Sequence, residues 1–198
     1  MKLPIETERL LLRKYEDRDL QDILDYSSDP DYWLSRTLDW PVTEEGVKTY
    51  WEAQREIDPG TDPEWFCLAV ELKSKRKVIG QVGIGVVGTG DERQGTIGWL
   101  LGTEFQGQGL ATEAAGALMT AAFKELRLHR ITAQTGRDNV RSWYLMERLG
   151  MRREAHFVKS HMIRGRWRDE FVYAVLADEW QAIQRRRLRQ LRHRPTKE

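Results

Sequence analysis

Apolar residues along this chain recur with two periods, that of a β-strand and that of an amphipathic helix, and the first half contains both. Asp19 and Thr43 are each suited to act as the N-cap of a helix, and a loop rich in aromatic residues is expected between the two helices. Short polar turns then separate three β-rich runs, which predicts an antiparallel meander. The expected elements are a strand over 10–15, a helix over 19–26, a loop over 27–41, a helix over 43–57, and strands over 65–72, 77–87 and 95–101.

The second half of the chain alternates between strands and helices. An Ala-rich segment with the spacing of a buried helix follows the meander, and a later helix ends at Gly150. A basic helix from about Asp178 closes the chain. The other expected elements are helices over 111–126 and 142–149 and strands over 130–135, 152–158 and 169–177. Together these elements predict an α+β fold with a central mixed sheet.

The length and charge of the chain indicate one domain with a distinct end. A chain of 198 residues can bury one substantial core, so we expect a single domain over 1–180 and a basic helical tail over 181–198. Lys and Arg number 32 against 31 Asp and Glu, and this near neutrality favours neither nucleic acid nor an anionic membrane as a partner of the whole chain. Without the tail, residues 1–180 hold 25 basic and 30 acidic side chains. The basic residues of the tail are Arg185, Arg186, Arg187, Arg189, Arg192, Arg194 and Lys197.

A run of like charges is usually the solvated face of a helix, and we favour that interpretation of the tail over contact with an acidic partner, nucleic acid or the ribosome. The single cysteine, Cys67, excludes an internal disulfide and favours a reducing compartment. The four histidines show no metal-binding spacing, so no metal site is expected. The beginning of the chain lacks the apolar core of a signal peptide, and no apolar run approaches the roughly 20 residues that cross a bilayer. These features predict a cytoplasmic protein without a membrane segment.

A glycine-bearing turn between strand 95–101 and helix 111–126 is the strongest candidate for chemistry. Such a turn presents several unpaired main-chain N–H groups, backed by the positive end of the helix dipole, and it therefore forms an anion site. Gly107 and Gly109 would let a diphosphate approach the main chain closely. The turn lacks the Lys of a Walker loop and the third glycine of a Rossmann turn, and the alternative is a tight connection without a ligand. The loop comprises Gln106, Gly107, Gln108, Gly109, Leu110, Ala111 and Thr112.

The surroundings of this loop resemble those of a known family. The pattern Gln106-x-x-Gly109-x-Ala111, between a strand and an Ala-rich helix, resembles the signature of the GCN5-related N-acetyltransferase (GNAT) superfamily. The segment Asn139-x-x-Ser142, followed by a helix that ends in Gly150-Met151, resembles a second conserved segment of that superfamily. The stretches 6–13 and 165–170 are similar to the branch that includes ribosomal-protein N-terminal acetyltransferases. The resemblance extends over about residues 5–180.

The resemblance implies the GNAT fold, in which a central mixed, mostly antiparallel twisted sheet is flanked by helices. The sheet would be splayed between its fourth and fifth strands, residues 95–101 and 130–135, and acetyl-CoA would be the co-substrate. The pantetheine arm would fill the opening like an added strand, and the main-chain N–H of Leu101 would polarise the thioester oxygen. No metal is required. The residues implied for cofactor binding are Leu100, Leu101, Gln106, Gly107, Gln108, Gly109, Leu110, Ala111, Thr112, Asn139 and Ser142.

Two positions depart from what the family often carries. Gln134 stands where certain members have a glutamate that acts as a base, and Met146 stands where many have a tyrosine that protonates the departing thiolate. A base would have to lie elsewhere, for example at Glu104 acting through water, or the amine would arrive deprotonated. Ser142 is then the remaining catalytic candidate beside the sulfur, although it could equally make a local bond at the start of the helix. Asn139 would bind the pantetheine amides or simply cap the same helix.

Two hypotheses for the activity follow. The first is an N-acetyltransferase that moves acetyl to a primary amine by direct attack on the thioester. A protein N-terminal α-amine is favoured because it titrates near ~8 rather than the ~10.4 of a lysine, with a polyamine or an aminoglycoside as alternatives. The second is a non-catalytic acetyl-CoA-binding sensor that docks on RNA or protein through the basic tail. Trp33, Trp40 and Trp167 are expected near the acceptor unless they serve packing, and the abundance of aromatic residues makes a homodimer reasonable.

Overall fold

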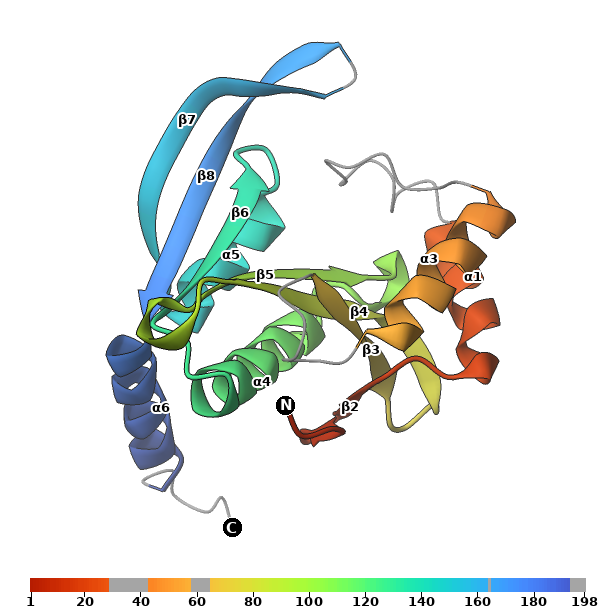
Figure 1. Cartoon of the computed structure of the whole chain (residues 1–198), viewed down its shortest axis with the longest axis horizontal. Coiled ribbons are helices and arrows are strands. Elements are labelled where there is room, and N and C mark those ends of the chain that lie inside the picture. Colours follow the sequence, from red (N-terminus) through yellow and green to blue (C-terminus); the bar gives the residue numbers. More distant parts are fainter. Residues whose placement is uncertain (29–42, 58–64, 164, 193–198) are drawn as a thin grey trace.

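The computed structural model describes residues 1–28, 43–57, 65–163 and 165–192. In these residues one eight-stranded sheet has the order β1-β2-β3-β4-β5-β6-β8-β7, with helices on both of its faces (Figure 1). The strands are β1 (Ile5–Glu6), β2 (Leu10–Arg13), β3 (Phe66–Leu72), β4 (Lys77–Val87), β5 (Gln94–Leu101), β6 (Arg130–Gly136), β7 (Arg152–Ile163) and β8 (Arg166–Leu176). The helices are α1 (Leu20–Ser27), α3 (Glu44–Glu56), α4 (Leu110–Glu125), α5 (Val140–Leu149) and α6 (Ala177–Arg192).

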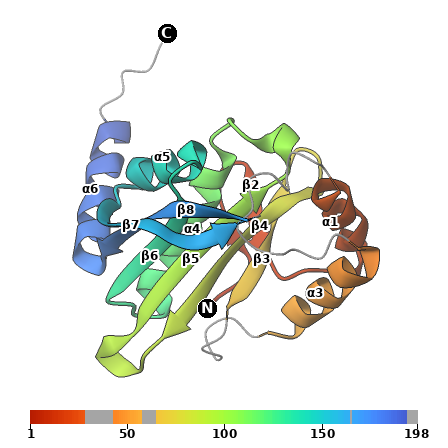
Figure 2. The same ribbon diagram turned by 90° about the horizontal axis from the view of Figure 1, so that it is seen from above.

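The sheet is mixed and mostly antiparallel, which confirms the predicted fold class. Only β5 and β6 pair in parallel, and the other neighbours in the sheet are antiparallel. Figure 2 shows α1 and α3 gathered at one end of the sheet and α5 and α6 at the other. The expected strands and helices of the meander and of the following strand-helix repeats lie within one or two residues of their observed bounds.

Two hydrophobic clusters lie on the two faces of the sheet. Strand β3 shows how they form, because Phe66, Leu68 and Val70 belong to the main core beneath α4 and α5, whereas Cys67 and Ala69 belong to a second cluster beneath α1 and α3. This is the alternation of side chains expected for a strand that is buried on both faces. The helices therefore hold the central strands rigidly from both sides.

Asp19 occupies the N-cap position of α1 as expected, but the capping bond expected from its side chain is not formed. The Asp19 side chain makes no capping bond to α1 and is instead buried, where its two oxygens accept hydrogen bonds from the Arg13 guanidinium at 2.7 and 2.9 Å. Glu71 accepts from the same guanidinium at 2.6 Å. Burial alone would lower the pKa of Arg13, but the hydrogen bonds to Asp19 and Glu71 outweigh it and raise that pKa. The cap of α3 is confirmed, since the Thr43 hydroxyl accepts from the N–H of Gly46 at 3.1 Å.

The C-terminal elements extend further than the sequence pattern indicates. Strands β7 and β8 form one long hairpin that projects from the body (Figure 1), rather than two short strands that end near 158 and begin at 169. Helix α6 begins at Ala177, and Trp180 in its first turn is only 2% exposed, so the domain boundary placed at residue 180 falls within a packed helix. None of the described helices is both long and apolar enough to cross a membrane.

Candidate active site

Strands β5 and β6 lie together at one end and separate toward the other. They pair with each other only over Gln94–Thr96 and Arg130–Thr132. Beyond these residues β5 stays paired with β4 alone, and β6 stays paired with β8 alone. At the closed end the hydroxyl groups of Thr96 and Thr132 lie 3.0 Å apart, and Thr132 is also within 3.2 Å of the Gly95 carbonyl. The predicted splay between these strands is confirmed, and Figure 1 shows β6 turning away from β5.

The two faces of this opening are not equivalent. Ile97 of β5 and Ile131 and Ala133 of β6 belong to the main core beneath α4 and α5. Because successive side chains of a strand point to opposite faces, Gly98 and Gln134 lie on the other face. The helices α4 and α5 therefore close one face, and a molecule lying between the strands can be reached only from the other, which we call the open face.

The predicted phosphate loop connects the end of β5 to α4. Gly107 and Gly109 adopt left-handed φ values of 75° and 77°, a conformation that glycine adopts without strain. Gly107 is exposed, and a Cβ there would meet nothing within 4 Å. Gly109 is the N-cap of α4, and no described side chain caps that end. The N–H groups of the first turn consequently point outward without intrahelical partners, as an anion site requires.

Two arginines that the sequence interpretation missed, Arg9 and Arg141, lie beside this loop, and Arg9 makes the more direct contact. Arg9 donates from Nη1 to the Gln108 carbonyl at 3.0 Å, and its Nη2 lies 3.6 Å from the position of a Cβ at Gly109. Glu113 holds Arg9 through an ion pair of 2.7 Å. Burial raises the pKa of Glu113, but the hydrogen bonds from Thr7 and Arg9 outweigh it and the net shift is downward. The only signal for Arg9 in the sequence was its place in the stretch 6–13, to which no role was assigned.

The side chains of the two loop glutamines support the loop instead of pointing at a ligand. Gln106 donates to the Leu101 carbonyl at 3.0 Å, and Gln108 donates to the Glu104 carbonyl at 2.9 Å. Arg141, in the first turn of α5, donates to Oε1 of Gln106 at 2.8 Å. This contact joins the N-terminal ends of α4 and α5 at the wide end of the opening and adds a second cation there.

The hydrogen-bond pattern of β5 determines which main-chain groups face the opening. Gly102 donates to the Ile79 carbonyl at 2.9 Å, so its N–H faces β4. Main-chain groups of successive residues point to opposite sides of a strand, and those of Leu101 and Trp99 therefore face the opening. The main chain of Leu100 faces β4, so any contribution of Leu100 to ligand binding is limited to its side chain. The main chain of Trp99, which was not among the expected residues, has the orientation that was expected of Leu100.

The start of α5 brings Asn139 and Ser142 to the same end of the opening. The Asn139 side chain accepts from the N–H of Ser142 at 3.3 Å, which is the capping bond of the simpler interpretation. Met146 is buried in the main core. Gln134 and Glu104 are both exposed. Ser142 lies in the first turn of α5, and a proton-donating role for its hydroxyl stays a prediction.

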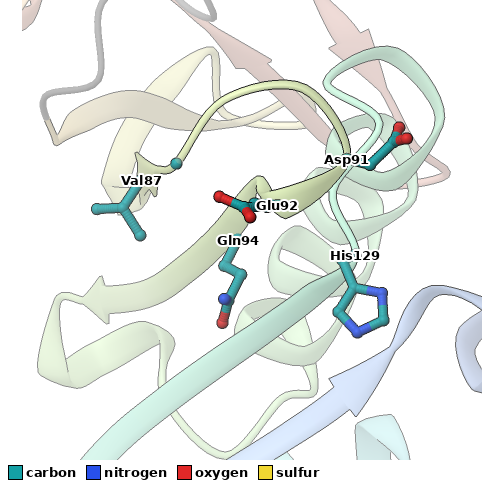
Figure 3. A pocket seen from close by; sticks show the side chains of 6 residues that line it. Val87, Asp91, Glu92, Gln94 and His129 are labelled. Carbon is teal, nitrogen blue, oxygen red and sulfur yellow. The ribbon is translucent and has the colours of Figure 1, made fainter.

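A shallow hollow of about 520 Å³ lies at the opposite end of β5, far along the strand from Leu101. Val87, Asp91, Glu92, Gln94 and His129 are among the residues that line it, and Figure 3 shows their side chains. In the described part of the chain, no three His, Cys, Asp or Glu side chains are grouped to hold a metal ion. The loop, the two arginines and the opening are therefore the better candidate site.

Comparisons with known proteins agree with this geometry. A family model described as an acetyltransferase (GNAT) domain matches residues 9–152. The chain therefore belongs to the GCN5-related N-acetyltransferase (GNAT) family, whose members use acetyl-CoA, and it is an acetyltransferase.

Its relatives include characterised and uncharacterised bacterial enzymes. The uncharacterized N-acetyltransferase YnaD of Bacillus subtilis is 34% identical over 176 residues, which cover 89% of this chain and 98% of that protein. The ribosomal protein uS5-alanine N-acetyltransferase of Escherichia coli is 27% identical, with 90% and 93% covered. The crystal structure of a GNAT-family acetyltransferase from Bacillus anthracis matches with a TM-score of 0.76 at 31% identity, covering 89% of this chain and 100% of that one. The similarity to the ribosomal-protein branch is thereby confirmed.

Proposed function

We propose that the protein transfers the acetyl group of acetyl-CoA to a primary amine by direct attack on the thioester, and that a protein N-terminal α-amine is its acceptor. The observation that carries this proposal is the opening between β5 and β6, which ends at an uncapped helix N-terminus flanked by Arg9 and Arg141. The similarity to the Escherichia coli enzyme named for ribosomal protein uS5 alanine supports the choice of acceptor. Such an acceptor is made in the cytoplasm, where we expect the protein to act.

Each part of acetyl-CoA has matching groups in the site. The pyrophosphate would accept hydrogen bonds from the N–H groups of the first turn of α4, with Arg9 and Arg141 adding positive charge. The pantetheine arm would lie along the inner edge of β5, where β4 leaves the main chain of Trp99 unused and the Leu101 carbonyl already accepts from Gln106. The N–H of Leu101 would then donate to the thioester oxygen as negative charge develops on it. Asn139 lies at the start of α5, beside the path of the arm.

The reaction needs a neutral amine and a protonated leaving group. The amine nitrogen forms a bond to the carbonyl carbon, the carbon–sulfur bond breaks, and the thiolate takes up one proton while the amine loses one. At pH 7 an α-amine with a pKa near ~8 is roughly 200 times more often neutral than a lysine near ~10.4. This difference favours an α-amine here, because Gln134 stands where certain family members have a glutamate that acts as a base, and a glutamine cannot accept the proton. We assign the proton on the leaving sulfur to the Ser142 hydroxyl.

Release of CoA thiol tests the proposal. We expect release with peptides that carry a free N-terminal α-amine and little release with Nα-blocked peptides that contain lysine, with polyamines or with aminoglycosides. Binding of acetyl-CoA without release above background for any amine would instead identify the non-catalytic sensor. Ser142→Ala should lower kcat without changing the Kd for CoA. If that substitution leaves kcat unchanged, Ser142 serves only the helix start.

A further inference from the structure

Trp65 lies flat against the sheet immediately before β3, although it is 40% exposed. Three glycines of β4 and β5 make room for its indole. A Cβ at Gly83 would lie 2.9 Å from Nε1, one at Gly85 would lie 3.1 Å from Cε3, and one at Gly98 would lie 3.0 Å from Cη2. Any side chain at these positions would displace the ring, so the indole extends across β4 to the surface of β5 in a fixed orientation.

A hydrogen bond holds the polar edge of this ring. Trp65 Nε1 donates to Cys67 Sγ at 3.1 Å, and Cys67 is only 4% exposed. Burial raises the pKa of the Cys67 thiol, so the sulfur stays neutral. With its N–H satisfied toward β3, the indole presents the apolar six-membered ring toward β5. A ring fixed in this way loses little conformational freedom when a ligand packs against it.

The position of Gly98 connects the indole to the opening. Gly98 comes two residues after Thr96, the last residue of β5 that pairs with β6. Its missing side chain would point to the open face, away from α4 and α5. The six-membered ring of Trp65 therefore borders the narrow end of the opening on the face from which an acceptor must approach.

We infer that Trp65 forms the fixed apolar wall of the acceptor site and packs against the side chain of the first residue of an acceptor peptide. This inference rests on the proposed function. The reacting nitrogen must be neutral, so the ring binds carbon atoms beside that nitrogen. The side chain on the adjacent Cα is the group of a peptide N-terminus that such a wall can contact and select.

Substitution of Trp65 tests this assignment with peptides that differ only in their first residue. Trp65→Ala should lower kcat/KM by about tenfold for peptides beginning with a residue that has a side chain, mainly through KM. The loss should be smallest for a peptide beginning with glycine. The Kd for CoA should be unchanged. Trp65→Phe keeps most of the wall and should retain most of the activity.

A second variant separates the wall from a general loss of structure. Gly85→Ala places a methyl group against Cε3 of the indole, away from the opening, and should reproduce the selective loss by tilting the ring. Gly116→Ala in α4, where the added Cβ lies at an ordinary 3.4 Å from Leu149, is the matched control and should leave the preference unchanged. Equal losses for all first residues in Trp65→Ala, or a weaker Kd for CoA, would overturn the inference. Turnover by the wild type tests the proposed function separately, because without it no α-amine peptide releases CoA.

Discussion

Replacement of Gly109 by aspartate should weaken CoA binding while leaving the fold intact. The substitution puts a carboxylate at the N-cap of α4, where the pyrophosphate is expected. Gly109→Asn is the matched control, because Asn and Asp have similar size and both tolerate the left-handed φ of 77° better than other residues with a side chain. The difference between the two variants therefore isolates the charge.

The size of that difference follows from Coulomb's law. A carboxylate about 6 Å from one phosphate charge costs ~0.7 kcal/mol at an effective dielectric constant of ~80 and ~2.8 kcal/mol at ~20. The Kd of the Asp variant should exceed that of the Asn variant by about 3- to 100-fold. The new carboxylate would also lie near Arg9, whose Nη2 is 3.6 Å from the Cβ position, and would occupy a cation that we assign to the pyrophosphate.

The same charge should have the opposite effect on the unliganded protein. A carboxylate at a helix N-terminus stabilises by about 0.3–1 kcal/mol, which corresponds to roughly 1–4 °C in Tm for a chain of this size. Isothermal titration with CoA and thermal unfolding without it measure the two effects. The ratio of the two Kd values should also shrink in 1 M salt, where the Debye length is about 3 Å. Equal Kd values for the Asp and Asn variants at low salt would refute the assignment of this loop to the pyrophosphate.

Three further predictions concern stability. Hydrogen bonds from the Lys159 N–H and from His156 lower the pKa of Asp169 from 3.8 to about 2. The stability that the ionised carboxylate contributes is therefore present above about pH 4 and lost between about pH 4 and 2. Asp169→Asn should remove this acid transition, which is followed by the fluorescence of the hairpin. Gly150→Ala forces a side chain at φ 91° to within 2.6 Å of Ile183 and should cost about 1–3 kcal/mol by thermal denaturation, part of which Ile183→Ala should restore. CoA at about 100 times its Kd should add about 2.7 kcal/mol and slow amide exchange in β5 and β6; unchanged exchange there would contradict strand-like binding of the arm.

Local patterns predicted most elements because their signals lie within a few residues. The capping of α3 by Thr43 and the end of α5 at Gly150 are of this kind. Asp19 misled the prediction because its carboxylate binds Arg13 and shares that guanidinium with Glu71, a partner 58 residues from Arg13 in the sequence. No local propensity reports such a contact. The long hairpin was underestimated for a related reason, since its exposed outer part is held by cross-strand pairing and lacks a core-facing apolar pattern.

The candidate site divides along the same line. The loop glycines were predicted because a single glycine is enough to allow a positive φ and a close approach of the main chain. Arg9 could not be predicted, because it reaches Gln108 across 99 residues of chain. Trp65 needed the register of β4 and β5, since only the paired strands bring Gly83, Gly85 and Gly98 under one ring. The aromatic residues first expected at the acceptor were Trp33, Trp40 and Trp167; the first two lie outside the described residues, and Trp167 is an exposed residue of β8.

The opening is also the reason that this sheet can bind an extended ligand. Strand β5 is completed on one side by β4 and strand β6 by β8, so their inner edges keep main-chain donors and acceptors beyond Thr96 and Thr132. Such groups are costly to bury unpaired, which drives the strands either to close together or to accept a partner. Closure is opposed by the position of β6, which its seven-residue ladder with β8 holds away from β5. In the binding mode that we propose, the amide groups of a pantetheine arm would pair with these edges. We therefore propose that a strand-like ligand completes this gap in the hydrogen bonding of the sheet, and that the phosphate loop at its wide end selects the ligand.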